Sequence, residues 1–99
     1  MTIRYDHLKQ RPFEPVRQHY GERDTMLYAL SLGLGSDPLC ADALPFFYEG
    51  APGGLRALPS QAVVLGYPGF WAREADTGID WVKLLHGEQR MRLHRPLPA

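Results

Sequence analysis

His86 is the residue whose type and position best suit chemistry. It stands in "KLLHGEQRMRLHRPLP", residues 83–98, between an apolar run and a charged alternation, and Gly87 follows it directly. A glycine allows a ligand to approach the backbone closely, and corners between elements often line ligand clefts. Taken from the residues alone, His86 is a candidate catalytic residue, a candidate ligand contact, or only the corner before a strand.

The other potentially reactive side chains give weaker patterns. No two of the four histidines stand at metal-ligand spacing with a carboxylate or thiolate beside them, so we expect no metal site. Cys40 follows "GSDPL" with no base partner marked in the sequence. A partly buried small residue is therefore the expectation for Cys40, in preference to a nucleophile.

The totals describe one small domain and limit its partners. In the 99 residues, 11 Lys and Arg balance 11 Asp and Glu, so we expect no nucleic-acid partner, which would need a basic surplus. The single cysteine excludes an intrachain disulfide and favours a cytoplasmic location. The first residues lack the apolar core of a signal peptide, and no apolar run approaches the ~20 residues of a span, so we expect no membrane partner.

The elements that position His86 follow from periodicity. Residues 1–19 show no clear period and predict an extended arm with one short strand. The segment 20–35 predicts a helix, and Gly33 or Gly35 can supply its left-handed C-terminal cap. Its apolar face consists of Met26, Ala29, Leu30, Gly33 and Leu34.

The rest of the chain is turn-rich and ends in a strand pattern. "LPFFYE" suggests a short strand, a short helix is expected from Ser60 to near Gly66, and "GIDWVKLL" suggests a helical turn. "GEQRMRLHR" alternates and predicts a strand, whose basic side chains face either solvent or an anionic ligand. These basic residues are Arg90, Arg92, His94 and Arg95. With one clear strand only, the fold class is α+β with a sheet that is incomplete in this chain.

Several blocks together resemble a known family. They are "YGERDTMLYALSLGLGSDPL", "LPFFYEG", "LPSQAVVLGYPGF" and "GIDWVKLLHGEQRMRLHRPLP". In order and spacing they resemble the N-terminal half of hydratase 2, the MaoC-like (R)-specific 2-enoyl-CoA hydratases, including the hydratase unit of peroxisomal multifunctional enzyme type 2. One departure is Gly21, where the family often carries a hydroxyl residue able to cap the helix.

The resemblance implies a fold, and it implies that catalysis and substrate binding belong to different repeats. The family has two hot-dog repeats, so residues 20–99 are expected to form the N-terminal part of a hot-dog domain after an arm at 1–19. Catalysis in the family belongs to a Gly-Asp-x-Asn-Pro-x-His motif in the second repeat. "GLGSDPLC" is the nearest match and lacks the Asn and His. No catalytic residue is therefore carried over, whereas His86 and Gly87 are assigned to acyl-CoA binding.

Two functions follow as expectations. The first is the substrate-binding portion of this lyase of fatty acid metabolism. We expect the enzyme to need no cofactor and the 99-residue chain to be inactive by itself. Another chain or domain would then supply the missing strands and the catalytic repeat. The alternative is a non-catalytic module that binds acyl-CoA or a partner, or a remnant of such a hydratase. In either case the unfinished sheet predicts a homo- or hetero-oligomer.

Overall fold

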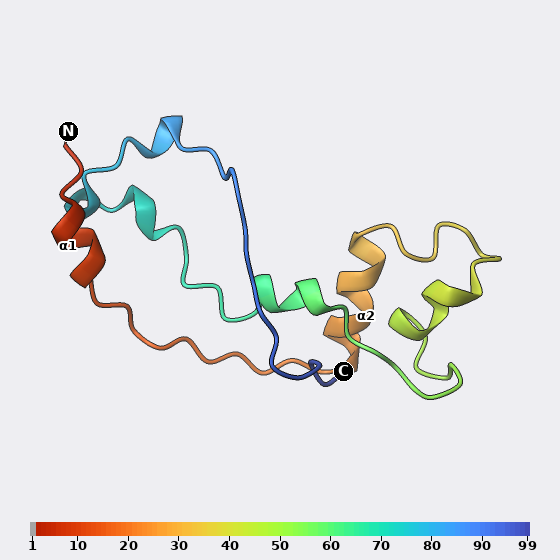
Figure 1. The fold of residues 1–99 in the computed structure, drawn as a ribbon. Helices are drawn as coiled ribbons and strands as arrows, with labels where there is room; N and C mark the ends of the chain where they lie inside the picture. Colours follow the sequence, from red (N-terminus) through yellow and green to blue (C-terminus); the bar gives the residue numbers. More distant parts are fainter. Residues whose placement is uncertain (1) are drawn as a thin grey trace. The chain divides into compact units, whose positions relative to one another are not determined.

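The computed structural model describes residues 2–99, and these form two compact units (Figure 1). The arm unit contains the described residues up to Arg17 together with Gly66–Arg90. The helix unit contains Gln18–Leu65 together with Met91–Ala99. Each unit therefore combines segments that are distant in sequence.

The elements are short and helical throughout residues 2–99, which contain no strand. The arm unit contains α1 (Tyr5–Gln10) and three 3₁₀ turns, η3 (Trp71–Arg73), η4 (Ala75–Thr77) and η5 (Trp81–Lys83). The helix unit contains α2 (Glu22–Ser31), η1 (Ala41–Phe46) and η2 (Pro59–Val63).

The helix predicted at residues 20–35 is confirmed as α2. Glycine at position 21 offers no capping side chain, but the Asp24 carboxylate accepts a hydrogen bond from the Gly21 N–H at 2.9 Å. At the other end, Gly33 has φ +92° and donates to Leu30, while the Leu34 N–H donates to the carbonyl of Ala29. This pair of bonds is the Schellman arrangement, which glycine favours because it has no Cβ.

The buried face of α2 differs from the predicted one. Thr25 and Ala29 are each 1% exposed, whereas Leu30 is 49% exposed. Small side chains allow η1 to approach α2, and the Tyr28 hydroxyl donates to the hydroxyl oxygen of Ser60 in η2 at 2.9 Å. The predicted stripe is therefore rotated, because neighbouring segments select the side of the helix with small residues.

Neither strand predicted from the sequence is present in residues 2–99, and the short strand expected in the arm is replaced by α1. "LPFFYE" lies partly in η1, because Pro45 has no N–H for a ladder and the Leu44 carbonyl accepts from Phe47 and Tyr48. Residues 87–93 have no regular secondary structure, residues 94–95 form a bend, and no neighbouring strand pairs with them. Alternation makes an extended chain possible, but a strand also needs a ladder of hydrogen bonds from a partner segment. An α+β sheet is therefore not seen in the described residues.

The other two expected turns are present in shorter form. Ser60 does not cap a helix; η2 has Pro59 in its first turn and follows Leu58. Proline suits this position because its missing N–H would have no partner there. The turn expected in "GIDWVKLL" is η5, with Asp80 directly before it.

The apolar core of the described residues is thin. The buried hydrophobic residues are Ala29, Ala51 and Ala72, whereas Leu39 is 90% and Leu85 is 88% exposed. Burying a leucine typically contributes about 1.5–3 kcal/mol, so this stabilisation is unused at the exposed positions. No helix among residues 2–99 is long and apolar enough to cross a bilayer.

Candidate functional site

His86 and Gly87 lie together in a groove of the arm unit. The groove has a volume of about 650 Å³. Its lining is mainly apolar and aromatic, with a few polar groups: Tyr67, Gly69, Phe70, Trp71, Ala72, Leu84, Leu85, His86, Gly87, Glu88 and Gln89. An apolar cleft of this size with a few polar groups is a typical small-molecule site.

The imidazole of His86 is exposed and oriented by the backbone. Its Nε2 donates to the Glu88 carbonyl oxygen at 3.0 Å. In the neutral ring this bond places the proton on Nε2, so Nδ1 is an acceptor. A Cβ added at Gly87 would have no heavy atom within 4 Å, so the backbone there is open to an approaching molecule.

Aromatic contacts order one wall of the groove. Phe70 meets the Trp81 ring edge-to-face at 6.0 Å, and Trp71 meets the Phe13 ring edge-to-face at 5.1 Å. Such pairs contribute about 0.5–1.5 kcal/mol beyond their buried area. Two rings that line the groove, Phe70 and Trp71, are thus each held by a ring outside it.

Beside this wall, Arg11 joins the arm to a pair of carboxylates. Its Nε donates to Asp76 Oδ2 at 3.0 Å, its Nη2 donates to Glu74, and the His7 Nε2 donates to Asp76 at 3.0 Å. The hydrogen bonds from Arg11 and then from His7 lower the pKa of Asp76 to about 2. The hydrogen bond to Asp76 raises the pKa of Arg11. Figure 1 shows α1, in red, next to the turn η4, in which Asp76 lies.

The sequence offered no signal for this cluster. Arg11 is 65 residues from Asp76 and 63 from Glu74, and His7 is 69 from Asp76. Pattern methods detect spacings of two to four residues along one element, so partners this distant have no signature. The aromatic lining residues were missed for the same reason.

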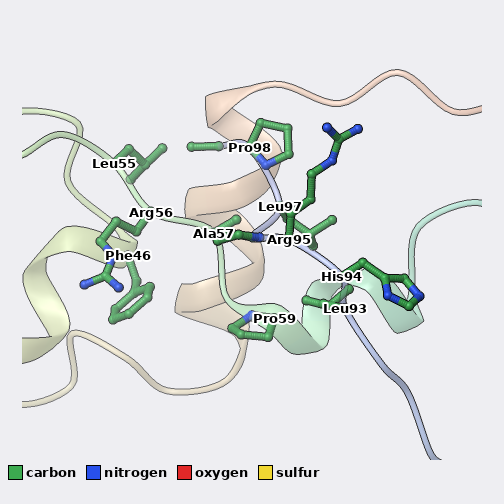
Figure 2. Close-up of a pocket in the computed structure, with 12 residues that line it drawn as sticks. Phe46, Leu55, Arg56, Ala57, Pro59, Leu93, His94, Arg95, Leu97 and Pro98 are labelled. Carbon is green, nitrogen blue, oxygen red and sulfur yellow. The ribbon is translucent and has the colours of Figure 1, made fainter.

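A larger groove, of about 910 Å³, lies in the helix unit (Figure 2). Apolar side chains such as Phe46, Leu55 and Leu97 line it, together with Arg56, His94 and Arg95. Figure 2 shows these three basic side chains pointing in different directions, and the Arg56 guanidinium lies 5.7 Å from the centroid of the Phe46 ring. They do not converge on one anion, so this groove is the weaker candidate.

The remaining predicted residues lie apart from one another. Arg90 donates to the Glu88 carboxylate at 2.6 Å, so it is paired within its own segment. Cys40 is exposed, which corrects the expectation of a partly buried residue, because it lies in an open turn between α2 and η1. Among residues 2–99, no three His, Cys, Asp or Glu side chains are grouped to hold a metal ion.

Comparisons with known proteins identify the family. Residues 18–99 match the model of the MFE-2 hydratase 2 N-terminal domain. The chain is 38% identical over 87 residues to 3-hydroxyacyl-thioester dehydratase Y of Mycobacterium tuberculosis, covering 87% of this chain and 28% of that protein. It is 34% identical over 95 residues to the peroxisomal enoyl-CoA hydratase 2 of Arabidopsis thaliana, covering 85% of this chain and 28% of that protein.

A third relative extends the match along the chain. "Probable enoyl-CoA hydratase 2" of Dictyostelium discoideum is 31% identical over 105 residues, covering 100% of this chain and 33% of that protein. No solved structure matches. The chain spans about a third of the length of the curated relatives that it matches. The family match covers residues 18–99, more than half of the sequence, so the chain belongs to the MFE-2 hydratase 2 N-terminal domain family.

Proposed function

We propose that this chain is the substrate-binding N-terminal portion of an (R)-specific 2-enoyl-CoA hydratase. Such an enzyme reversibly adds water to trans-2-enoyl-CoA and forms (R)-3-hydroxyacyl-CoA. The observation that carries the proposal is the family match over residues 18–99, which includes every residue lining the groove with His86 and Gly87.

The chemistry of the groove suits an acyl-CoA thioester. Leu84, Phe70 and Trp71 offer apolar surface to an acyl chain, which binds by leaving water. His86 Nδ1 is an acceptor for an amide N–H of the CoA arm, and the open backbone at Gly87 admits the thioester. His86 and Gly87 therefore act in binding.

The reaction itself is assigned to residues outside this chain. In the proposed enzyme an Asp and a His of a Gly-Asp-x-Asn-Pro-x-His motif activate water for attack on the β-carbon. This is general acid–base catalysis, with amide donors polarising the thioester carbonyl. Residues 1–99 lack that motif, and we infer that a second repeat supplies it.

The proposal includes completion of a hot-dog sheet. The alternating segment 87–95 belongs to no helix in the structure, and we propose that a strand from another chain or domain pairs with its backbone groups. Leu39 and Leu85, both largely exposed, would then be available for burial in an oligomer or against a second repeat. The cytoplasmic location stays a prediction, since one relative is named peroxisomal.

The same alternating segment favours a second candidate function. A non-catalytic module could capture a partner by β-strand addition along residues 87–95 while binding acyl-CoA in the groove, and a remnant of a hydratase would behave likewise. Light scattering, which measures the oligomeric state, tests this second candidate function, because a well-folded monomer that recruits no partner contradicts it.

Calorimetric titration with crotonyl-CoA, alongside free CoA, tests the main proposal. We expect the 99-residue chain to bind crotonyl-CoA more tightly than free CoA and to hydrate none of it. Hydration should appear when a chain carrying the catalytic repeat is added. Binding without any restored hydration favours the non-catalytic module, and turnover by the pure chain contradicts the assignment of catalysis to other residues.

A further inference from the structure

The N-terminal segment 2–17 lies outside the residues that the family model matches, yet it is anchored at several points. Arg11 is the central anchor: its side chain is 12% exposed, and it binds the carboxylates of Asp76 and Glu74. A guanidinium with two carboxylate partners is held in a fixed orientation, because its donors form a planar fork.

The aromatic rings give Arg11 a second set of contacts. Its guanidinium carbon lies 5.1 Å from the centroid of the Phe13 ring and 5.7 Å from that of the Trp71 ring. Phe13 and Trp71 themselves meet edge-to-face. The three side chains form one cluster, to which the arm contributes Arg11 and Phe13 and the matched domain contributes Trp71.

A third anchor lies near the start of the arm. The Thr2 carbonyl approaches Gly78 so closely that a Cβ at position 78 would collide with it. Gly78 also has φ +67°, a backbone conformation that side chains other than glycine rarely adopt. The docking of the arm therefore depends on a residue of the matched domain that has no side chain.

Trp71 connects this cluster to the groove. Its ring contacts Phe13 and Arg11 and also lines the groove that contains His86 and Gly87. We propose that residues 2–17 are a strap, and that Arg11 is a positioning residue: by holding Trp71, it sets the wall of the groove and hence its affinity for acyl-CoA. The affinity part of this inference rests on the proposed function; the docking of the strap does not.

Two measurements test the strap in the 99-residue chain. Hydrogen exchange, read by mass spectrometry, should increase about three- to fivefold at residues 71–74 in Arg11→Ala, the scale of a lost cation–π and ion-pair contact. The amides of Trp71, Arg73 and Glu74 donate backbone hydrogen bonds, so their exchange reports on the wall that carries Trp71. In a Trp81→Phe background, Trp71 is the only tryptophan. Its emission should shift to longer wavelength in Arg11→Ala, because water reaches a ring that the strap had covered.

Control variants separate positioning from general destabilisation. Arg17→Ala removes an exposed arginine of the same segment, so it should leave both signals unchanged. Arg11→Lys keeps the positive charge but loses the planar guanidinium with its paired N–H donors, so it should restore only part of the protection from hydrogen exchange. Exchange within α2, in the helix unit, should be the same in every variant. If Arg11→Ala does not fold, Arg11→Lys and Phe13→Leu decide by the same signals.

Crotonyl-CoA titration then tests the consequence for binding. We expect Arg11→Ala to weaken binding about threefold while Arg17→Ala binds as wild type, in line with a loosened wall. Unchanged exchange and emission in Arg11→Ala, an equal increase within α2, or equal affinity would overturn the inference. If the wild-type chain binds no acyl-CoA, the proposed function fails, and exchange with emission alone decides whether the strap exists.

Discussion

The Arg11 Nε lies 3.0 Å from the Asp76 Oδ2, although the two residues are 65 positions apart. This contact joins a segment that the family model does not match to one that it does. It is charge-assisted and reinforced by the His7 hydrogen bond to the same carboxylate oxygen. The Asp76 carboxylate is thus one of the points at which the arm attaches.

The attachment should be resistant to acid down to an unusually low pH. The pKa of Asp76 is lowered to about 2, so the folded state binds its proton less readily than the unfolded chain does. The stabilisation is therefore present above the ordinary value of 3.8 and lost as pH falls toward 2. An NMR titration of the Asp76 carboxyl carbon should show a midpoint near 2, returning toward the ordinary value in Arg11→Ala; a midpoint near the ordinary value in the wild-type chain would contradict the ion pair.

His86→Ala should weaken acyl-CoA binding. Loss of one hydrogen-bond acceptor corresponds to about 0.5–1.5 kcal/mol, so the dissociation constant should rise about two- to twelvefold. His19→Ala is the matched control, since His19 is exposed and does not line the groove. In an enzyme assembled with the catalytic repeat, KM should rise while kcat changes little. A large fall in kcat with unchanged KM would instead give His86 a role in the chemical step.

Gly78→Ala should destabilise the arm unit. Alanine at φ +67° costs roughly 1–2 kcal/mol, and its Cβ would also press on the Thr2 carbonyl. We expect faster hydrogen exchange at α1 and η4, with α2 unaffected. Gly53→Ala is a control for conformation alone, because Gly53 has φ +86° but a Cβ added there would meet no heavy atom within 4 Å. Equal exchange at α1 in wild type and Gly78→Ala would mean that Thr2 is not docked there.

Tyr28→Phe should loosen the contact between α2 and η2. The Tyr28 hydroxyl donates to Ser60 at 2.9 Å in a partly buried setting, and losing such a bond typically costs about 0.5–1.5 kcal/mol. Urea unfolding of Tyr28→Phe, Ser60→Ala and the double variant measures the coupling. We expect the double variant to be less destabilised than the sum of the single ones, and strict additivity would show that the two hydroxyls do not interact.

Local features of the chain were predictable because their causes lie within a few residues. The helix α2 lies within the predicted range, although its buried face differs, and its end follows from Gly33, whose positive φ closes the cap. The turn after Asp80 and the blocks that resemble hydratase 2 were likewise visible in the sequence, and the family is confirmed. The roles of His86 and Gly87 stay predictions, although the two residues do lie in one groove.

Contacts between distant segments were decided by tertiary structure. Alternation at 87–95 indicated a strand, but pairing depends on a neighbour that residues 2–99 do not provide. The side of α2 that is buried depended on which face η1 and η2 could approach. The Arg11–Asp76 pair had no spacing to reveal it, because an ion pair depends on distance in space and only a folded chain brings these two side chains together.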